Sequence, residues 1–407
     1  MSMMYKKYKI KDLAIVNPSK KAIKDLDPDT NVSFIPMEYV SNEGTILKMG
    51  IEKYKDVSKG FTYFEENDIL FAKITPCMEN GKGGLVKNLT NFVGFGSTEF
   101  HVIRANTDII DPKYLYYIVH SKLFRKQAGS NMTGSAGQKR VPKQFIENYE
   151  LNVPNKKIQL KIVELLDMMQ TLITKRKETI AKLDELIQAV FLWMFGDLKY
   201  NSKKFEVGKL GDYTTHVSSG STPKGGQSSY LDAGIPLIRS QNVLMHKLAL
   251  DGVAFISNET HQNMKRSQLM HKDVLLNITG ASIGRIAVYD GKDYGANVNQ
   301  HVCIIRLVED LDPYYVSYYI GSQKFQHEIK MLNTGATREA LNYSQIKNFD
   351  IIIPPKKIQS DFKKVVQKIN CQKTTMVKSL GDLELNFQSL LQKTFKGELD
   401  FNTEITA

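Results

Sequence analysis

The sequence has few cysteines, and they form no pairing motif. Cys77, Cys303 and Cys371 are the three cysteines among 407 residues, and no two of them have the CxxC spacing. This pattern argues against a disulfide framework and against a zinc finger, and it suits a reducing compartment. We therefore expect a cytoplasmic protein.

Long apolar runs are also missing. No stretch reaches the roughly 18 apolar residues that a transmembrane helix needs. The first residues, MSMMYKKYKIKDLA, lack the apolar core and the cleavage site of a signal peptide. The sequence therefore predicts no transmembrane helix, and we expect no partner embedded in a membrane.

The sequence lacks the common catalytic motifs. The eight histidines form no HExxH motif, and no GxSxG motif occurs. The stretch GSTPKGG at 220–226 has the glycine spacing of a phosphate loop, but it lacks the Lys-Ser/Thr that would contact the phosphates and magnesium. Together these absences favour a binding protein without catalytic activity or metal site.

One short motif resembles a catalytic one and needs a separate interpretation. DPYY at 312–315 is similar to the Asp/Asn-Pro-Pro-Tyr/Phe motif of amino-methyltransferases, but Tyr314 replaces the second proline. The corresponding residues 111–114 are DPKY, so the third residue varies. An aspartate followed by proline is typical of a helix N-terminus, with Asp as the cap and Pro in the first turn. We therefore predict helix starts at both places.

What the chain does have is positive charge. Its formal net charge is +12 and its pI is about 9.2. A strongly basic chain favours a polyanionic partner, either nucleic acid or an anionic membrane surface.

The chain also has an internal repeat. PNKKIQ at 154–159 and PPKKIQ at 354–359 match at five of six positions, 200 residues apart. Upstream, DPKYLYYIVHSKLF at 111–124 aligns with DPYYVSYYIGSQKF at 312–325, and EFHVIR at 99–104 aligns with HVCIIR at 301–306. NDILFAKITP at 67–76 matches KDVLLNITGA at 272–281 in its pattern. The chain is therefore predicted to be two homologous halves.

Each half is predicted to be an α/β (α+β) module followed by a long helix. Residues 68–74, 273–279, 284–291 and 301–307 have the β-rich composition of strands. After each hexapeptide, apolar residues recur every three or four positions over about 38 residues, which predicts one long helix ended by Gly196 or Gly397. The expected boundaries are 1–153 and 197–355 for the modules, 154–196 and 356–396 for the helices, and 397–407 for a tail.

A long helix with an apolar stripe needs a partner. We expect the two helices to pair as an antiparallel coiled coil with pseudo-two-fold symmetry; the alternative is that each packs separately on its own module. Ile187 lies on the stripe but is not assigned to the interface. The predicted interface residues are Ile162, Leu166, Met169, Ile173, Ile180, Leu183, Val190, Phe362, Val366, Ile369, Met376, Leu383, Phe387 and Leu390.

Residue types suited to DNA contact occur in the expected loops. Arginine can bind guanine with two hydrogen bonds, Asn and Gln can bind adenine, and Lys, Ser and Thr can bind phosphates. In the first half the candidates are Lys73, Thr75, Lys82, Lys139 and Arg140. In the second half they are Arg239, Gln241, Asn242, Thr279, Ser282, Arg285 and Arg338.

The whole pattern resembles the DNA-specificity (S) subunit of type I restriction–modification systems. The resemblance rests on the order of modules and helices and on GIPLIRSQNV at 234–243, DVLLNITGASIGRIAVYD at 273–290, NQHVCIIRL at 299–307 and IIPPKKIQ at 352–359. SSGSTPKGG at 218–226 is similar to a loop of that family. The first half departs more, because FAKITPCMENGKGGLV at 71–86 replaces the commoner glycine-serine turn.

The resemblance implies that each module is a target-recognition domain for one half of a split site in double-stranded DNA. It implies that the helices set the gap between the half-sites and dock two methyltransferase (M) subunits. Restriction (R) subunits would complete the complex. The chain itself would hold no cofactor, because S-adenosylmethionine, ATP and Mg would be bound by partners that methylate adenine and cleave DNA.

Two other functions stay open at this point. One is the specificity domain of a related, type II-like methyltransferase or endonuclease. The other is a protein scaffold that associates through its helices and has no DNA role. Salt-sensitive DNA binding separates this scaffold from a DNA-binding protein, because phosphate contacts give a steep salt dependence.

Overall fold

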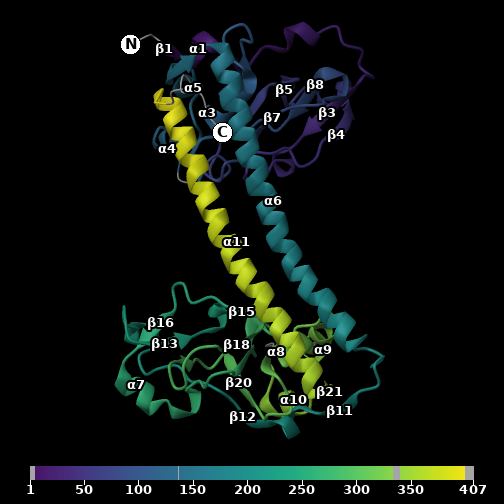
Figure 1. Cartoon of the computed structure of the whole chain (residues 1–407). Helices are drawn as coiled ribbons and strands as arrows, with labels where there is room; N and C mark the ends of the chain where they lie inside the picture. Colours follow the sequence, from purple (N-terminus) through teal and green to yellow (C-terminus); the bar gives the residue numbers. More distant parts are fainter. Residues whose placement is uncertain (1–4, 136, 333–339, 399–407) are drawn as a thin grey trace, which may run out of the picture. The chain divides into compact units, whose positions relative to one another are not determined.

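The computed structural model describes residues 5–135, 137–332 and 340–398 (Figure 1). The chain divides into two compact units. Unit 1 comprises residues 1–177 and 378–407, and unit 2 comprises residues 178–377. Each long helix therefore begins in one unit and ends in the other. Among the described residues, none of the helices has the length and apolar character required to cross a membrane.

Unit 1 is built around two four-stranded sheets, with strand orders β2-β9-β6-β7 and β4-β3-β8-β5, and a β1-β10 pair. Its strands are β1 (Tyr5–Lys9), β2 (Ala14–Val16), β3 (Asn31–Ile35), β4 (Gly50–Lys53), β5 (Thr62–Glu65), β6 (Ile69–Ala72), β7 (Gly83–Leu85), β8 (Val93–Gly96), β9 (Phe100–Ala105) and β10 (Glu150–Pro154). Its helices are α1 (Ile10–Leu13), α2 (Tyr54–Val57), α3 (Pro112–His120), α4 (Lys122–Ser130) and α5 (Lys143–Asn148).

Unit 2 has a four-stranded sheet of order β12-β20-β17-β18, a three-stranded sheet β16-β13-β19, and the pairs β11-β21 and β14-β15. Its strands are β11 (Glu206–Lys209), β12 (Thr214–Ser219), β13 (Ile235–Ile238), β14 (Val243–Leu244), β15 (Lys247–Leu248), β16 (Ala254–Ile256), β17 (Val274–Asn277), β18 (Ile286–Val288), β19 (Asn297–Val298), β20 (Val302–Leu307) and β21 (Asp350–Ile353). Its helices are α7 (Asn258–Asn263), α8 (Pro313–Ile320), α9 (Gln323–Leu332) and α10 (Tyr343–Lys347).

The two units share one strand topology. In the sheets β2-β9-β6-β7 and β12-β20-β17-β18, all three strand pairs are antiparallel. In each second sheet, β3 or β13 pairs parallel with β8 or β19 and antiparallel with β4 or β16. The strands predicted at 68–74, 273–279, 284–291 and 301–307 are confirmed as β6, β17, β18 and β20.

Both predicted helix starts at the DPxY segments are confirmed. The Asp111 side chain accepts hydrogen bonds from the backbone N–H groups of Lys113 and Tyr114 at the start of α3, and Asp312 accepts one from Tyr314 at the start of α8. Each aspartate satisfies donors that have no partner inside the helix, and the following proline loses nothing because its position needs no N–H.

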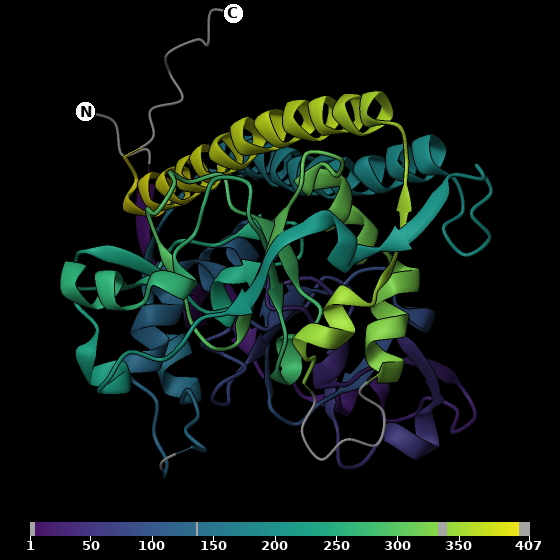
Figure 2. The same cartoon turned by 90° about the horizontal axis from the view of Figure 1, so that it is seen from below.

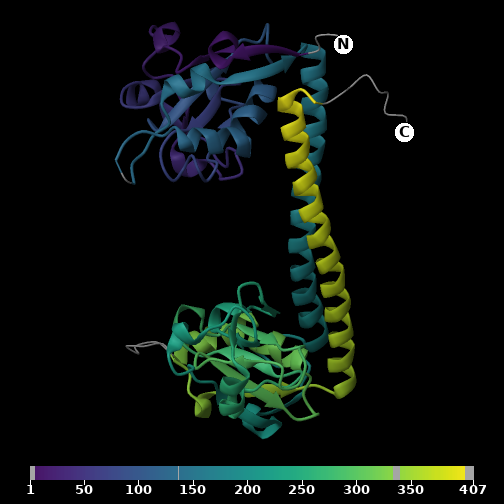
Figure 3. The same ribbon diagram turned by 90° about the vertical axis from the view of Figure 1, so that its left-hand side faces the viewer.

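The two long helices are α6 (Lys156–Phe195) and α11 (Lys356–Lys396), and Gly196 and Gly397 follow them with φ of +77° and +74°. These φ angles suit glycine at a helix end, as predicted. In unit 2 the end of α6 lies beside the start of α11 (Figure 3), with the Phe195 and Phe362 ring centroids 5.3 Å apart. The helices therefore pack together with antiparallel directions, which confirms the predicted pairing over separate packing.

The helix end from one half completes the core of the unit that it enters. In unit 2, Phe195 at the end of α6 packs on Tyr315 of α8, with ring centroids 4.6 Å apart. In unit 1, Phe395 at the end of α11 packs on Tyr114 of α3, with centroids 6.3 Å apart. Tyr114, Tyr315 and Phe195 are fully buried. Each module thus covers its tyrosine with a phenylalanine from the helix that starts in the other unit.

The last residue of the first hexapeptide, Gln159, joins α6 to unit 1. Its side chain is fully buried. Its Oε1 accepts a hydrogen bond from the N–H of Asp111 (2.8 Å), and its Nε2 donates to the carbonyl groups of Ile109 (3.0 Å) and Pro154 (2.9 Å). One amide therefore ties the start of α6 to the start of α3 and to the end of β10.

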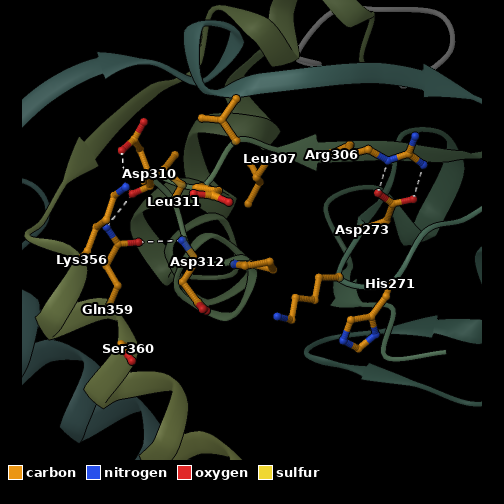
Figure 4. Close-up of a pocket in the computed structure, with 14 residues that line it drawn as sticks. His271, Asp273, Arg306, Leu307, Asp310, Leu311, Asp312, Lys356, Gln359 and Ser360 are labelled. Carbon is orange, nitrogen blue, oxygen red and sulfur yellow. Dashed lines mark hydrogen bonds and ion pairs between the residues drawn. The ribbon is translucent and has the colours of Figure 1, made fainter. Parts of the chain in front are cut away.

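Gln359 forms the same joint in unit 2. Its Oε1 accepts from the N–H of Asp312 (2.8 Å), and its Nε2 donates to the carbonyl of Asp310 (3.1 Å) (Figure 4). Nε2 also donates to the carbonyl of Pro354 (2.7 Å). Lys356 forms an ion pair with Asp310 at 2.8 Å. Figure 2 shows β21 leading directly to the first turn of α11. The hexapeptides repeat because each one fixes a long helix to its module.

Replacing Gln359 with leucine is expected to lower the free energy of unfolding by about 2–3 kcal/mol. Leucine has a similar volume but no polar atoms, so one buried N–H and two carbonyl groups would lose their partner. Urea denaturation of the full chain measures the change. The control is Gln170→Leu on the exposed side of α6, where we expect a change below about 0.5 kcal/mol. Equal effects at both positions would contradict this role.

Candidate nucleic-acid interface

A buried ion pair stands at the start of the central strand in each unit. In unit 2, Arg306 of β20 binds both carboxylate oxygens of Asp273, with Nε–Oδ1 of 2.8 Å and Nη2–Oδ2 of 2.7 Å (Figure 4). Asp273 also accepts a hydrogen bond from the N–H of Met270 at 2.7 Å. Asp273 is 1% exposed. The hydrogen bonds that Arg306 donates to Asp273, and the charge of that carboxylate, hold the pKa of Arg306 above its ordinary value, although burial lowers it.

Unit 1 repeats this ion pair. Arg104 of β9 binds Asp68 with Nε–Oδ1 of 2.8 Å and Nη2–Oδ2 of 2.7 Å, and Asp68 accepts from the N–H of Glu65 at 2.7 Å. Each aspartate directly precedes the central strand, β6 or β17, and lies opposite its arginine in the antiparallel register. The pair therefore fixes the register of the strand that carries the candidate DNA-binding residues at its other end.

The five candidates of unit 1 gather at the far end of β6. The backbone of residues 73–75 pairs with residues 139–141: Thr75 N–H donates to Lys139 (3.0 Å), and Val141 N–H donates to Lys73 (2.8 Å). Lys82 precedes β7, and its carbonyl accepts from the N–H of Ala72 at 3.1 Å. Two short segments far apart in sequence thus bring the candidates together.

These five side chains differ in their availability. Lys139 is exposed. The Arg140 guanidinium binds both carboxylate oxygens of Glu99, at 2.9 and 2.7 Å, and Lys82 Nζ donates to the carbonyl of Met37 at 3.0 Å. Lys139 is therefore open to solvent at this edge, whereas Arg140 and Lys82 have partners inside the unit.

Unit 2 forms the corresponding edge at the far end of β17. Leu341 N–H donates to the carbonyl of Ile278 at 2.9 Å, as Val141 does to Lys73 in unit 1. The buried side chain of Asn277 donates to the carbonyl of Ser240 (2.8 Å) and to Ser282 Oγ (3.1 Å). Asn277 therefore ties together two 3-10 turns, Ser240–Asn242 and Gly280–Ser282, which contain the candidates Gln241, Asn242 and Ser282.

Some unit 2 candidates serve the fold. Asn242 is buried; its Oδ1 accepts from the N–H of Arg239 (3.0 Å), and its Nδ2 donates to the carbonyl of Ala249 (2.9 Å). Thr279 Oγ1 lies 2.6 Å from Nδ1 of His301. Both amide ends of Asn242 are thus occupied within the unit.

The other unit 2 candidates lie nearer to solvent. Arg239 stacks over the Tyr230 ring, with 5.4 Å from Cζ to the centroid. Gln241 and Arg285 are exposed. Arg338 lies outside the described residues. Gln241 and Arg285 are therefore the candidates of this unit whose side chains are most open to solvent.

The predicted helix-pair residues take part in two hydrophobic clusters. In unit 1, Ile162, Leu166, Ile173 and Phe387 are buried, and Met169, Leu383 and Leu390 pack against them. In unit 2, Phe362, Val366 and Ile369 are buried, and Leu183 and Val190 pack against them. Ile180 and Met376 are half-buried and belong to neither cluster. Ile187, which was left unassigned, is buried in the unit 2 cluster with Phe191 and Phe195.

A histidine–glycine contact occurs in both units with the two residues exchanged. In unit 1, His120 at the end of α3 packs on Gly44, where a Cβ atom would lie 2.4 Å from His120 Cε1. In unit 2 the ring belongs to His246, between β14 and β15, and it packs on Gly321 after α8, where a Cβ would lie 2.2 Å from His246 Cε1. His120 and Gly321 occupy the same place in the aligned DPxY segments.

Both rings lie flat on a tyrosine. The ring centroids are 5.3 Å apart for His120 and Tyr116 and 3.8 Å apart for His246 and Tyr318, with interplanar angles of 11° and 8°. Burial lowers the pKa of His120 and of His246 to about 4. Both rings are therefore neutral at pH 7 and act as packing groups.

Because histidine and glycine have exchanged places between the units, a second substitution is expected to restore the stability that the first one removes. Gly44→His alone places two rings in one space, so it is expected to lower the free energy of unfolding by about 2–3 kcal/mol. Adding His120→Gly should recover most of this loss, because the double variant has the arrangement of unit 2, where His246 has a φ of +57°. Urea denaturation of both single variants and the double variant measures the coupling. A double variant as unstable as Gly44→His would contradict the exchange.

Among the described residues, no group of three or more His, Cys, Asp or Glu side chains could hold a metal ion.

A family model described as "Type I restriction modification DNA specificity domain" matches residues 4–184 and 202–376. The chain belongs to this family. The two matches fall on the two modules, and each extends into the long helix that follows.

Curated members of the type I specificity family match parts of the chain. The Escherichia coli type I restriction enzyme EcoAI specificity subunit is 44% identical over 153 residues, which are 37% of this chain and 25% of that protein. The E. coli EcoEI specificity subunit is 39% identical over 155 residues, 38% of this chain and 26% of that protein. The matched stretch thus spans about a quarter of these two relatives. The Methanocaldococcus jannaschii MjaIX specificity subunit is 26% identical over 72% of this chain and 70% of its own length.

Solved structures share the fold of this family member. A chain from a structure on complex assembly and conformational transition of the type I R-M system aligns with a TM-score of 0.65 and 18% identity, over 98% of this chain and 99% of that chain. The type I restriction-modification S subunit from M. genitalium aligns with a TM-score of 0.55 and 15% identity, over 96% of both chains. These alignments cover both units and both long helices.

Proposed function

We propose that this chain is the DNA sequence-recognition subunit of a type I restriction–modification complex. Each module would be a target-recognition domain that binds one half of a bipartite site in double-stranded DNA. The observation that carries the proposal is the double match of the specificity-domain family, on two modules that present equivalent edges at β6 and β17. The net charge of +12 supports a polyanionic partner.

The proposed recognition domains are residues 1–153 and 197–355. Within them the exposed Lys139, Gln241 and Arg285 are the candidates best placed to reach DNA, since their side chains are open to solvent. The helices 154–196 and 356–396 would set the gap between the half-sites and dock two methyltransferase subunits, and the tail is 397–407. Restriction subunits would join the full complex.

The chain is proposed to catalyse nothing by itself and to hold no cofactor. S-adenosylmethionine, ATP and Mg would be bound by the partner subunits. Two measurements test this: the purified chain should neither bind S-adenosylmethionine nor methylate DNA unaided. Methyl transfer by the chain alone would place an enzyme here and overturn the assignment.

Module exchange tests the recognition role. Residues 1–153 are replaced by the corresponding module of another type I specificity subunit, and methylation by the assembled complex is mapped. One half of the recognised site should change while the other half and the gap stay the same. Replacing 197–355 is the matched control and should change only the other half. Changes in both halves, or in neither, would refute the proposal that each module recognises one half-site.

Helix length tests the spacing role. Seven residues are inserted into α6 between Lys175 and Leu183 and, to keep the pairing, into α11 between Lys373 and Glu384. Lys177–Glu384 (2.9 Å) and Asp184–Lys373 mark the facing positions. The insertion adds about 10 Å of helix, which is about three base pairs of DNA. The mapped gap should lengthen accordingly, and an unchanged gap would remove the helices from this role.

A further inference from the structure

The N-terminal half of α4 in unit 1 carries three basic side chains around one cavity. Lys122, Arg125 and Lys126 line a cavity of about 430 Å³ together with Glu79, Gly129 and Ser130. Lys122 and Lys126 are exposed, and Arg125 is half-buried. Among the described residues, the Arg125 guanidinium has no hydrogen bond and no ion pair, and its Nε atom is fully buried without a partner.

A partly buried guanidinium without a hydrogen-bond partner lowers the stability of the folded protein, and an anion bound to it would offset this loss. Burial lowers the pKa of Arg125, because the nearby groups do not offset the loss of water around the charge. Arg104 and Arg306, which are also half-buried, each bind an aspartate with two hydrogen bonds, and Arg239, whose Nε is likewise buried without a partner, donates through Nη2 to the carbonyl of Gly252 at 3.4 Å. Arg125 therefore differs from Arg104, Arg239 and Arg306, whose guanidinium groups each donate at least one hydrogen bond within the described residues.

In unit 2 the residue at the equivalent position has only a structural role. Directly after the aligned segments 111–124 and 312–325, unit 1 has Arg125 and unit 2 has Gln326 of α9. Gln326 Nε2 donates to the carbonyl groups of Gly284 and Ile320, both at 2.9 Å. A Cβ at Gly284 would lie 2.6 Å from the Gln326 side chain, and a Cβ at Gly81 would lie 1.9 Å from Arg125 Nη1, so both side chains fill the same niche. A neutral amide satisfies this niche, and unit 1 has a charge there instead.

We propose that Arg125, Lys122 and Lys126 form a site for a DNA backbone phosphate that only unit 1 carries. It rests on the proposed function and adds an asymmetry to it: unit 1 holds the DNA backbone through α4, whereas the aligned positions in unit 2 are Gln323, Gln326 and His327. Guanidinium and ammonium groups are the usual partners of phosphate oxygens. The site contributes affinity without base preference, because phosphate contacts carry no sequence information directly.

Arg125→Gln tests the site with a side chain that unit 2 already accommodates. The full chain, with its methyltransferase subunits, is titrated with a duplex containing its mapped site over a range of salt concentrations. The variant should flatten the slope of log K against log [salt] by about 1 and weaken binding about fivefold near 0.15 M salt. The methylated sequence should stay unchanged, and the urea midpoint should not fall.

The control is Lys24→Gln, an equal charge change at an exposed residue of unit 1 that does not line the cavity. It should leave the slope within error of the unaltered chain. An unaltered slope for Arg125→Gln, or an equal drop for Lys24→Gln, overturns the proposal. Loss of methyltransferase association in Arg125→Gln at an unchanged slope overturns it too, because the anion would then belong to a protein. A parent complex that fails to bind DNA would instead refute the proposed function itself.

Discussion

Replacing Asp273 with alanine is expected to lower the free energy of unfolding by about 3–5 kcal/mol, because it leaves Arg306 charged and half-buried without its partner. Asp273 gives two oxygens to the guanidinium and accepts the N–H of Met270, so three hydrogen bonds are lost at once. The substitution also frees the start of β17, the strand that ends at the candidate DNA edge. Urea denaturation of the full chain measures the effect.

The control is Asp350→Ala. Asp350 forms an ion pair with Lys209 at 2.6 Å, but both side chains are at least half exposed, so the loss should stay below about 1 kcal/mol. Asp68→Ala in unit 1 should have a smaller effect than Asp273→Ala, because Arg104 keeps its ion pair with Glu65 at 2.7 Å. Similar small losses at Asp273 and Asp350 would contradict the structural role of the buried pair.

Replacing Phe362 with alanine is the second large change, with an expected loss of about 3–5 kcal/mol. The ring is fully buried and contacts Phe191, Phe195 and Tyr318 at centroid distances of 5.3 Å. It therefore joins α6, α11 and α8 within unit 2. Thermal or urea unfolding of the full chain tests the loss.

The matched control is Val377→Ala on the same helix. Val377 is 50% exposed, so its loss should stay within about 0.5 kcal/mol. A small loss for Phe362→Ala would mean that the helix pair contributes little to unit 2, and the proposed spacing role would lose its mechanical basis.

Local signals in the sequence predicted much of this fold. Asp111 and Asp312 each precede a proline and an aromatic face, and both start helices as expected. The three-and-four spacing of apolar residues predicted α6 and α11, with Gly196 and Gly397 at their ends. Such features depend on neighbours along the chain, so one sequence is enough to find them.

Contacts between distant segments could not be predicted in this way. Asn242 has a residue type suited to adenine, but its amide is occupied by the backbone of Arg239 and Ala249, which no local pattern indicates. Arg140 likewise has Glu99 as its partner. Arg125 was not among the predicted DNA-binding residues, because the sequence does not show that its guanidinium has no partner in the fold. The comparison with Gln326, which fills the same niche in unit 2, makes this difference clear.

The aligned DPxY segments have His120 in one copy and Gly321 in the other, but the alignment alone does not show what either residue contacts. Gly44 and His246 lie outside those segments, in turns that no sequence match connects. The contact becomes understandable only once each turn is seen packed on α3 or α8. Comparing the two copies of the fold thus reveals a pair of contacting residues that neither copy shows by itself.

We propose that this chain supplies the DNA sequence specificity of a methylating complex. Genome-wide mapping of methylated adenine, with the gene present and with it deleted, tests this claim most directly. We expect a set of methylated sites, each with two specific half-sites and a fixed gap, that disappears on deletion and returns when the gene is restored. A methylation pattern that is unchanged by deletion, while the partner methyltransferase is produced and active, would contradict the claim.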